Sequence, residues 1–240
     1  MSKPLNLDQI DVDGAVRETA AEAMDALGGD TRSAFLRRAG LAGGALVGGG
    51  AILGALAPAA MAFSTGDRPP AKFGKGDIGI LNYALTLEYL ESTFYNEATS
   101  HQHKHGFIKD AETRVFLRTV TDDENQHVAA LKSVLGHHAV KKPKFNFHGD
   151  NADEKKFKTA AFTFENEGVH AYSGQAFNIK DPKVLAAALS IVTIEARHAS
   201  VIGLIAQRSE SGISPNGAFD KPYGASRVLA DVTSLNYIVG

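Results

Sequence analysis

Two stretches, Glu124-Asn-Gln-His127 and Glu195-Ala-Arg-His198, decide the fold that we predict for this chain. Each sets a carboxylate and an imidazole three residues apart, and on an α-helix this spacing puts both side chains on one face. Each pair also interrupts an apolar helical pattern, where ionisable groups need partners to offset the cost of their burial. Because the motif occurs twice in such surroundings, it indicates the ligands of a two-ion metal site inside a four-helix bundle.

Four long segments carry apolar residues with the helical period of about 3.6 residues. We expect helices at about 77–98, 110–135, 153–178 and 181–207, and a short C-terminal helix at 226–235. The last long segment is apolar on nearly all sides, which predicts that it is the most buried helix. His101, His103 and His105 fall in a predicted loop that Gly106 closes.

The connection between the second and third predicted helices, residues 137–151, decides the topology. A helix of about 26 residues is roughly 39 Å long, and about fifteen extended residues span roughly 50 Å. The connection is therefore long enough to run the length of the bundle and to start the third helix parallel to the second. The sequence predicts an all-α four-helix bundle over 77–207 with a long crossover, followed by a C-terminal loop and short helix over 208–240.

Composition excludes several kinds of chemistry. The 240 residues include no cysteine, so disulfides, thiol nucleophiles and iron–sulfur clusters are ruled out. The formal net charge is -2, and the only basic cluster is short, at residues 141–144. A nucleic-acid partner is therefore disfavoured.

The first 62 residues have the pattern of an export signal rather than of a domain. A polar extension leads to Arg37-Arg38 and to the uncharged Gly/Ala-rich stretch 41–62, which ends in Ala60-Met61-Ala62. The segment Thr31-Arg32-Ser33-Ala34-Phe35-Leu36-Arg37 resembles a twin-arginine signal, with Ser33 in place of the second arginine. We expect cleavage after Ala62, a lead-in over 63–76 and a periplasmic or extracellular location. The alternative is an uncleaved membrane anchor, which would be the chain's only contact with a membrane.

The two Glu-x-x-His helices each follow a helix with a glutamate and, seven residues later, a tyrosine. Tyr95 follows the first glutamate and Tyr172 the second, so that 77–135 and 153–207 read as two related helix pairs. Together the pairs offer six inward candidate metal ligands, which are Glu88, Glu124, His127, Glu165, Glu195 and His198. Four carboxylates offset the charge of two divalent ions, and this oxygen-rich set suits iron or manganese better than structural zinc.

This order of residues resembles the di-iron carboxylate site of the ferritin-like superfamily. Residues 85–95 and 164–172 further resemble the exported, desiccation-related branch of ferritin-like proteins. The resemblance implies that Glu124 and Glu195 bridge the two ions. It also implies that Glu88 with His127 completes one ion position and Glu165 with His198 the other. Tyr95 and Tyr172 would orient the ligands or accept an oxidising equivalent, and so are the candidate catalytic residues.

The resemblance also implies a function. Two iron ions would serve Fe(II) oxidation or the reduction of O2 or H2O2 in oxidative or desiccation stress. The alternatives are a manganese site that dismutates peroxide, and a stress-protection protein in which metal only stabilises the bundle. Haem between subunits is not expected, because its methionine ligand is absent after Ala62. A homo-oligomer is compatible with the family.

Other residues compete for the site. Glu167 and His170 form a third Glu-x-x-His, on a less apolar side of the third helix, and we interpret them as surface or rim residues. Glu91 lies one turn from Glu88 and could replace it, although the spacing to the tyrosine favours Glu88. The six residues could also form a metal-free network of ion pairs. The three histidines at 101–105 are a solvated loop or, alternatively, a metal-loading site.

Overall fold

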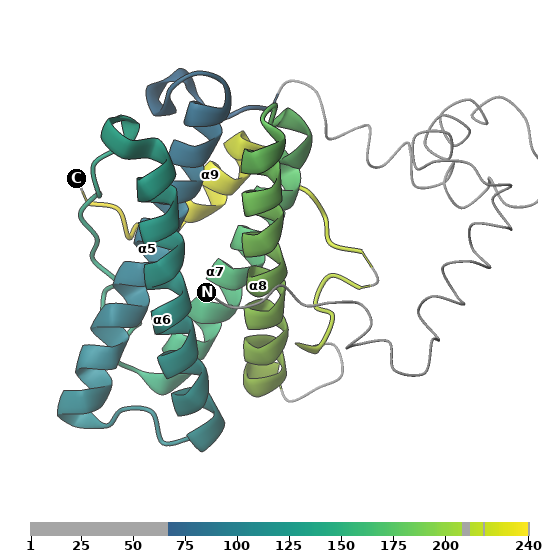
Figure 1. The fold of residues 1–240 in the computed structure, drawn as a ribbon. Coiled ribbons are helices and arrows are strands. Elements are labelled where there is room, and N and C mark those ends of the chain that lie inside the picture. Colours follow the sequence, from purple (N-terminus) through teal and green to yellow (C-terminus); the bar gives the residue numbers. More distant parts are fainter. Residues whose placement is uncertain (1–66, 208–211, 218, 240) are drawn as a thin grey trace, which may run out of the picture. The chain divides into compact units, whose positions relative to one another are not determined.

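A computed structural model describes residues 67–207, 212–217 and 219–239. The predicted export segment and most of the lead-in lie outside the described residues. The helices are α5 (Gly76–His105), α6 (Ala111–Leu135), α7 (Glu154–Gln175), α8 (Pro182–Gln207) and α9 (Ala225–Ser234) (Figure 1). Short 3-10 turns cover Ala71–Phe73, Gly136–His138 and Ala176–Asn178. The described residues hold no strand, so the all-α prediction is confirmed.

The four long helices form two antiparallel hairpins, α5 with α6 and α7 with α8 (Figure 1). Asp110 caps α6 by accepting a hydrogen bond from the Thr113 backbone at 3.3 Å. Asp181 stands before Pro182 at the start of α8 and accepts from the Lys183 backbone at 2.8 Å. Side chains of this type accept hydrogen bonds from the free N–H groups of a first helical turn. The starts of α6 and α8 were therefore predictable from the sequence.

The first long helix extends further than the sequence indicated. α5 runs to His105, so the predicted loop with three histidines is wrong, and these residues form the last turns of the helix. No glycine or proline interrupts residues 99–105. The helix ends at Gly106, which has φ 58° and donates its N–H to the Gln102 carbonyl. A left-handed glycine is the usual end of a helix.

The crossover from α6 to α7 runs along the bundle, as its length predicted (Figure 1). The C-terminal tail holds it in place. Asn146 donates its backbone N–H to the Tyr237 carbonyl at 2.8 Å, and Val239 donates to the Lys144 carbonyl at 2.9 Å. Phe147 of the crossover is buried beside Phe94 of α5, with ring centres 5.2 Å apart. The crossover and the tail therefore close one side of the bundle together with α9.

The expectation that α8 is the most buried helix is wrong. Leu189, Val201 and Leu204 of α8 are each about half exposed, whereas α5 has most of its residues buried. By length and composition α8 is also the one described helix apolar enough to cross a bilayer. Hydropathy alone does not indicate how many sides of a helix are packed. α8 packs closely on α7 and only loosely on α6, which leaves an apolar strip uncovered.

Candidate metal centre

The six predicted ligands meet in the middle of the bundle, between two apolar clusters. Leu85, Leu131 and Ile191 belong to the cluster on one side, and each lies about one turn from a predicted ligand. Val120 and Ile202 belong to the larger cluster on the other side. Helical periodicity therefore places all six side chains on inward faces at one level of the bundle. All six are buried, with four glutamates at most 1% exposed.

Their atoms form two overlapping groups, each able to hold a metal ion. One group is Glu88, Glu124, His127 and Glu195, and the other is Glu124, Glu165, Glu195 and His198. Within each group, one candidate ligand atom per residue lies within 4.8 Å of the others. Glu124 and Glu195 belong to both groups, which is the placement that the family resemblance implied for bridging ligands. Their role as ligands remains a prediction.

The first group converges on one imidazole nitrogen. His127 Nδ1 lies 3.3 Å from Glu88 Oε2, 3.3 Å from Glu124 Oε2 and 3.2 Å from Glu195 Oε1. One ring N–H cannot donate a well-directed bond to three acceptors. Only the contact with Glu124 has hydrogen-bond geometry. The oxygens of Glu88 and Glu195 that face His127 have no hydrogen-bond partner.

The second group repeats this arrangement around His198. Its Nδ1 lies 3.1 Å from Glu165 Oε2 and 3.3 Å from Glu124 Oε1. Glu124 thus directs one oxygen at each histidine, and its Oε1 has no hydrogen-bond partner. Both oxygens of Glu195 also lack a partner. Buried carboxylate oxygens without donors are rare in folded proteins, and their convergence fits the oxygen-rich coordination that iron and manganese take.

The charge in the cluster gives the same indication. Burial and the neighbouring charge of Glu88 raise the pKa of Glu124 to about 7. Burial and the charge of Glu124 raise the pKa of Glu195 well above its usual range. Burial lowers the pKa of His198, but its hydrogen bonds to Glu124 and Glu165 outweigh burial and raise that pKa to about 11. The carboxylates are thus short of positive charge, which two divalent ions would supply.

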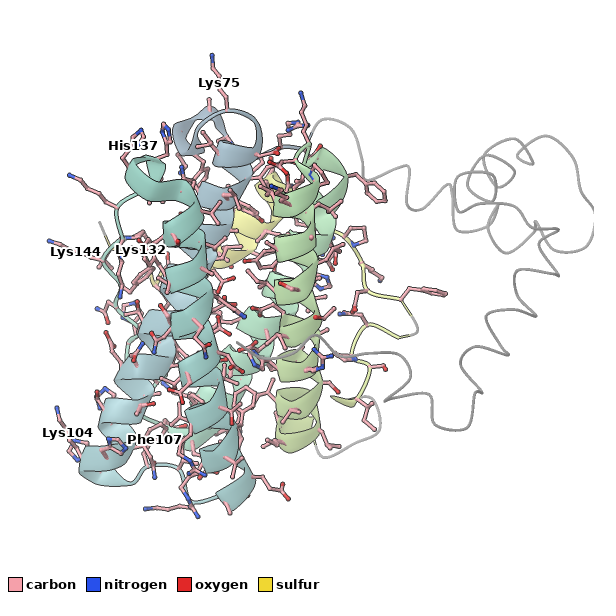
Figure 2. All side chains as sticks on the ribbon, in the orientation of Figure 1. Lys75, Lys104, Phe107, Lys132, His137 and Lys144 are labelled. Carbon is pink, nitrogen blue, oxygen red and sulfur yellow. The ribbon has the colours of Figure 1, made fainter. Side chains whose placement is uncertain are left out.

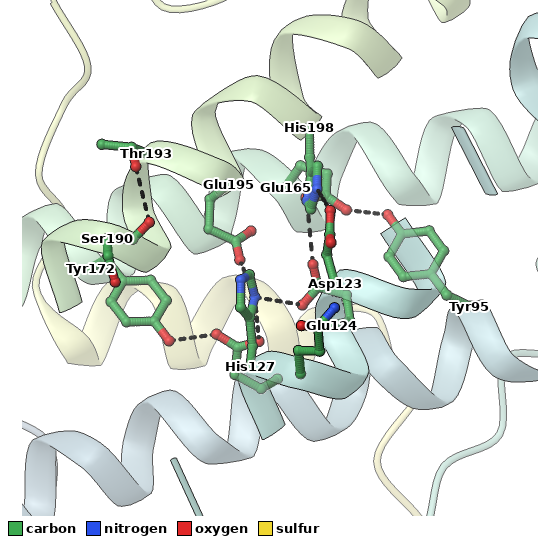
Figure 3. Close-up of polar contacts among 12 residues, drawn as sticks. Tyr95, Asp123, Glu124, His127, Glu165, Tyr172, Ser190, Thr193, Glu195 and His198 are labelled. Atoms are coloured by element: carbon green, nitrogen blue, oxygen red, sulfur yellow. Dashed lines mark hydrogen bonds and ion pairs between the residues drawn. The ribbon is translucent and has the colours of Figure 1, made fainter. Parts of the chain in front are cut away.

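The two tyrosines contact the glutamates of the opposite helix pair. Tyr95 of α5 donates its hydroxyl to Glu165 of α7, and Tyr172 of α7 donates to Glu88 of α5. Figure 3 shows them at opposite ends of the cluster. Burial, and then the carboxylate that each contacts, raise the pKa of both phenols well above the usual range. Both therefore remain neutral donors, and each fixes the outer oxygen of one glutamate.

Sequence reasoning missed Asp123. His198 Nε2, the nitrogen that faces away from the cluster, lies 3.0 Å from Asp123 Oδ2 (Figure 3). A carboxylate on the outer nitrogen of a metal-binding histidine fixes the ring and raises its basicity. Asp123 immediately precedes Glu124, but its partner is 75 residues away, so the sequence carried no direct signal for the contact. At the corresponding position before Glu195, the chain has Ile194.

Asp123 also lies at the end of a groove between α6 and α8. The groove has a volume of about 580 Å³ and is mostly apolar, with walls that include Val115, Phe116, Val201 and Leu204. His198 lines its floor. With its side chain 33% exposed, Asp123 is the most accessible group that contacts the cluster. The groove therefore reaches from the surface to one histidine of the candidate metal centre.

Glu91 and Gly168 occupy corresponding places in α5 and α7, three residues after Glu88 and Glu165. Glu91 is buried but belongs to neither group of candidate ligands, whereas Glu88 belongs to one, and the choice of Glu88 as the ligand stays a prediction. Burial and the charge of Glu195 raise its pKa well above the usual range. On the other helix, a Cβ at Gly168 would lie 2.8 Å from Glu195 Oε2. At these corresponding positions, α5 therefore carries a glutamate side chain and α7 carries none.

The third Glu-x-x-His lies outside both groups of candidate ligands, but His170 is not a surface residue as predicted. It is 4% exposed, donates its Nδ1–H to the Lys221 carbonyl at 2.6 Å, and stacks on Tyr223 with ring centres 4.0 Å apart. Since a carbonyl only accepts, Nδ1 is the donor. The C-terminal segment covers this side of α7, a long-range contact that helical periodicity does not report.

These features define a class: a bundle of four long helices with a crossover, and carboxylates and histidines from all four helices meeting inside it. A sequence profile described as a ferritin-like domain matches residues 76–208. The chain therefore belongs to the ferritin-like domain family. A search of curated proteins finds no match.

Proposed function

We propose that this chain is a di-metal carboxylate protein, with iron as the metal, that couples Fe(II) oxidation to the reduction of O2 or H2O2. The observation that carries the proposal is the convergence of unpartnered glutamate oxygens on His127 and His198. Bound iron would supply the redox change: two Fe(II) lose one electron each, and one H2O2 takes two electrons and two protons to give two waters. The remaining steps belong to the protein's own residues.

The protein residues would bind, orient and shield the ions. Glu124 and Glu195 would contact both positions, since each belongs to both groups. Tyr95 and Tyr172 would hold the terminal glutamates through their hydroxyl donors and are the nearest phenols able to give up an electron and a proton. The apolar clusters on either side keep the site dry, which strengthens electrostatic interactions within it.

Access favours a small oxidant or ion that enters beside Asp123. The groove between α6 and α8 reaches His198 and Asp123, whereas Glu124, Glu165 and Glu195 have no exposed surface. An uncharged oxidant such as O2 or H2O2 would cross the apolar walls readily. A carboxylate at the inner end would attract Fe(II) and would pass protons to and from the outer nitrogen of His198.

The test is metal analysis followed by rapid mixing. The full chain, freed of metal, is titrated with Fe(II) without oxygen and then mixed with O2 or H2O2 while absorbance is recorded. We expect two ions per chain and one H2O2 consumed per two Fe(II). A chain that is redox-silent and equally stable with and without metal would refute the proposal. Manganese with oxygen release from H2O2 would instead support the peroxide-dismutating alternative.

Location and physiological setting are further parts of the proposal. The uncharged stretch that ends at Ala62 and the preceding Arg37-Arg38 support export by the twin-arginine route. That route carries folded proteins, so the metal could be chosen in the cytoplasm. The resemblance of residues 85–95 and 164–172 to the desiccation-related branch supports a role in drying or oxidative stress. N-terminal sequencing of the exported protein tests the first part: a chain that retains residues 1–62 would overturn cleavage.

A further inference from the structure

The last turns of α5 carry a second cluster of metal-binding side chains, far from the candidate metal centre. His101 and His105 are four residues apart, one helical turn, and their rings face each other with centres 6.3 Å apart and planes 28° from parallel. His101 is partly exposed and His105 exposed. About thirteen residues separate His101 from Glu88, which is roughly 20 Å along a helix. The histidine pair therefore belongs to a different site.

We propose that His101 and His105 form a surface site for a single divalent transition ion that prefers nitrogen ligands, such as Cu²⁺ or Zn²⁺. Two histidines at this helical spacing lie on one face and chelate one ion, as in helical zinc motifs. The centre of an imidazole lies about 3.2 Å from an ion that it ligates, so two rings on one ion have centres about 4.5 to 5.2 Å apart when the bonds meet at about 90° to 109°. The observed separation of 6.3 Å is about 1 Å wider, so both side chains must rotate to turn their nitrogens toward one ion.

Both rings are available for such an ion. Within the part of the chain that the structure describes, neither ring makes a hydrogen bond or an ion pair, and their one recorded contact is with each other. An ion that binds these two rings would not have to break any existing hydrogen bond or ion pair. The imidazole nitrogens therefore keep their full capacity to bind.

The local field also favours a cation. The pair lies in the last turns of α5, where the carbonyl end of a helix carries partial negative charge. Glu97, one turn before His101 on the same face, adds a carboxylate that Asn151 holds through Oε2 at 2.8 Å. Lys104 opposes binding, but it is exposed at the end of the bundle (Figure 2) and is free to turn into solvent. Lys109, whose Nζ donates to the Gly106 carbonyl at 2.6 Å, offsets part of this negative charge.

The two metal sites would differ in chemistry. The interior cluster offers three glutamates and one imidazole nitrogen for each ion position, which suits iron or manganese. The surface pair offers imidazole nitrogens and water, which favours copper, nickel and zinc. Since the affinity of any such site rises toward copper, Cu²⁺ would bind at both places, whereas iron or manganese would bind only in the interior.

The experiment is a Cu²⁺ titration of the full chain, in which binding is measured by calorimetry and by electron paramagnetic resonance. His101→Ala and His105→Ala are the test variants. His103→Ala is the matched control, because His103 lies about 200° around the helix from His101. Alanine favours helix, so none of the three should unfold α5, and circular dichroism checks this directly.

We expect wild type and His103→Ala to bind one surface Cu²⁺ with a nitrogen hyperfine pattern from two imidazoles, distinct from any interior Cu²⁺, which would have one imidazole for each ion. Loss of either paired histidine should weaken that binding at least about tenfold, since even an indirect partner of a ligand contributes that much. Equal loss in all three variants, or no loss in any, would overturn the proposal. Glu124→Ala separates the two sites: it should abolish paired iron binding and leave the surface Cu²⁺ signal unchanged.

Discussion

Replacing Gly168 by alanine tests the geometry of the candidate metal centre at its most crowded point. A Cβ at this position would lie 2.8 Å from Glu195 Oε2 and 3.3 Å from its Cδ. Ordinary contact between such atoms begins at 3.4 Å, so the carboxylate must move by about 0.6 Å. Metal–ligand distances tolerate only about 0.2 Å. Since Glu195 belongs to both groups of ligands, both ion positions should be disturbed.

The expected change in stability is small in the metal-free protein and large in the metal-bound protein. Alanine in the interior of a helix is favoured over glycine by about 1 kcal/mol, so metal-free Gly168→Ala should be within about 1 kcal/mol of wild type in its free energy of unfolding. A tenfold loss of affinity at each position removes about 1.4 kcal/mol of metal-dependent stabilisation per ion, or about 2.7 kcal/mol for two. The variant should therefore lose stability only when metal is present.

Urea unfolding with and without Fe(II), together with ion stoichiometry, measures both quantities. Thr163→Ala is the control: Thr163 lies on the same helix, its hydroxyl donates to the Thr159 carbonyl at 3.1 Å, and it is about 200° around the helix from Glu165. It should gain helix stability without any loss of metal. If Gly168→Ala binds two ions with wild-type affinity, Glu195 is not a shared ligand and the proposed arrangement is refuted.

Five further substitutions test other parts of the site. Glu124→Ala and Glu195→Ala should each abolish paired metal binding in calorimetry, whereas Glu167→Ala should leave two ions bound; equal loss from all three would contradict the assignment. The pKa of Glu91 is raised in the folded protein, so the metal-free chain binds more protons than the unfolded one and loses stability as pH rises above about 4.5. Glu91→Gln should therefore unfold at higher urea concentration than wild type at pH 8 and differ little at pH 5, and a pH-independent difference would argue against a protonated Glu91. Asp123→Asn should weaken one of two ions by about tenfold, and a loss shared equally by both would show that the aspartate acts on the whole site.

Much of the site was predictable because burial and periodicity act locally. An ionisable residue in an apolar helical stripe needs a partner. The spacing of Glu124 and His127 therefore indicated a metal ion as that partner, and it identified the two residues as candidate ligands without any knowledge of the fold. The same reasoning located α8 and its two candidate ligands. Asp110 and Gly136 begin and end α6 through contacts with residues close in the sequence. The boundaries of this helix were therefore also predictable.

The features that the sequence did not reveal depend on contacts between distant segments. Asp123 gains its role from a histidine on another helix, and His170 is buried by the C-terminal segment. The exposed strip of α8 reflects loose packing against α6, which no property of α8 alone determines. The end of α5 differs in kind: the interpretation of three histidines as a loop overlooked that the first helix-ending residue after Ala98 is Gly106.

The departures from two-fold symmetry are the best guide to how the two ion positions differ. The helix pairs repeat each other in six candidate ligands and two tyrosines, but Asp123 corresponds to Ile194 and Glu91 to Gly168. Asp123 adds negative charge and solvent access beside His198, whereas the corresponding sequence position in the other helix pair is the apolar Ile194. Because the ligands themselves match, a difference between the two positions in affinity or rate must arise from these surrounding residues. The position beside His198 should therefore exchange its ion and meet the oxidant first.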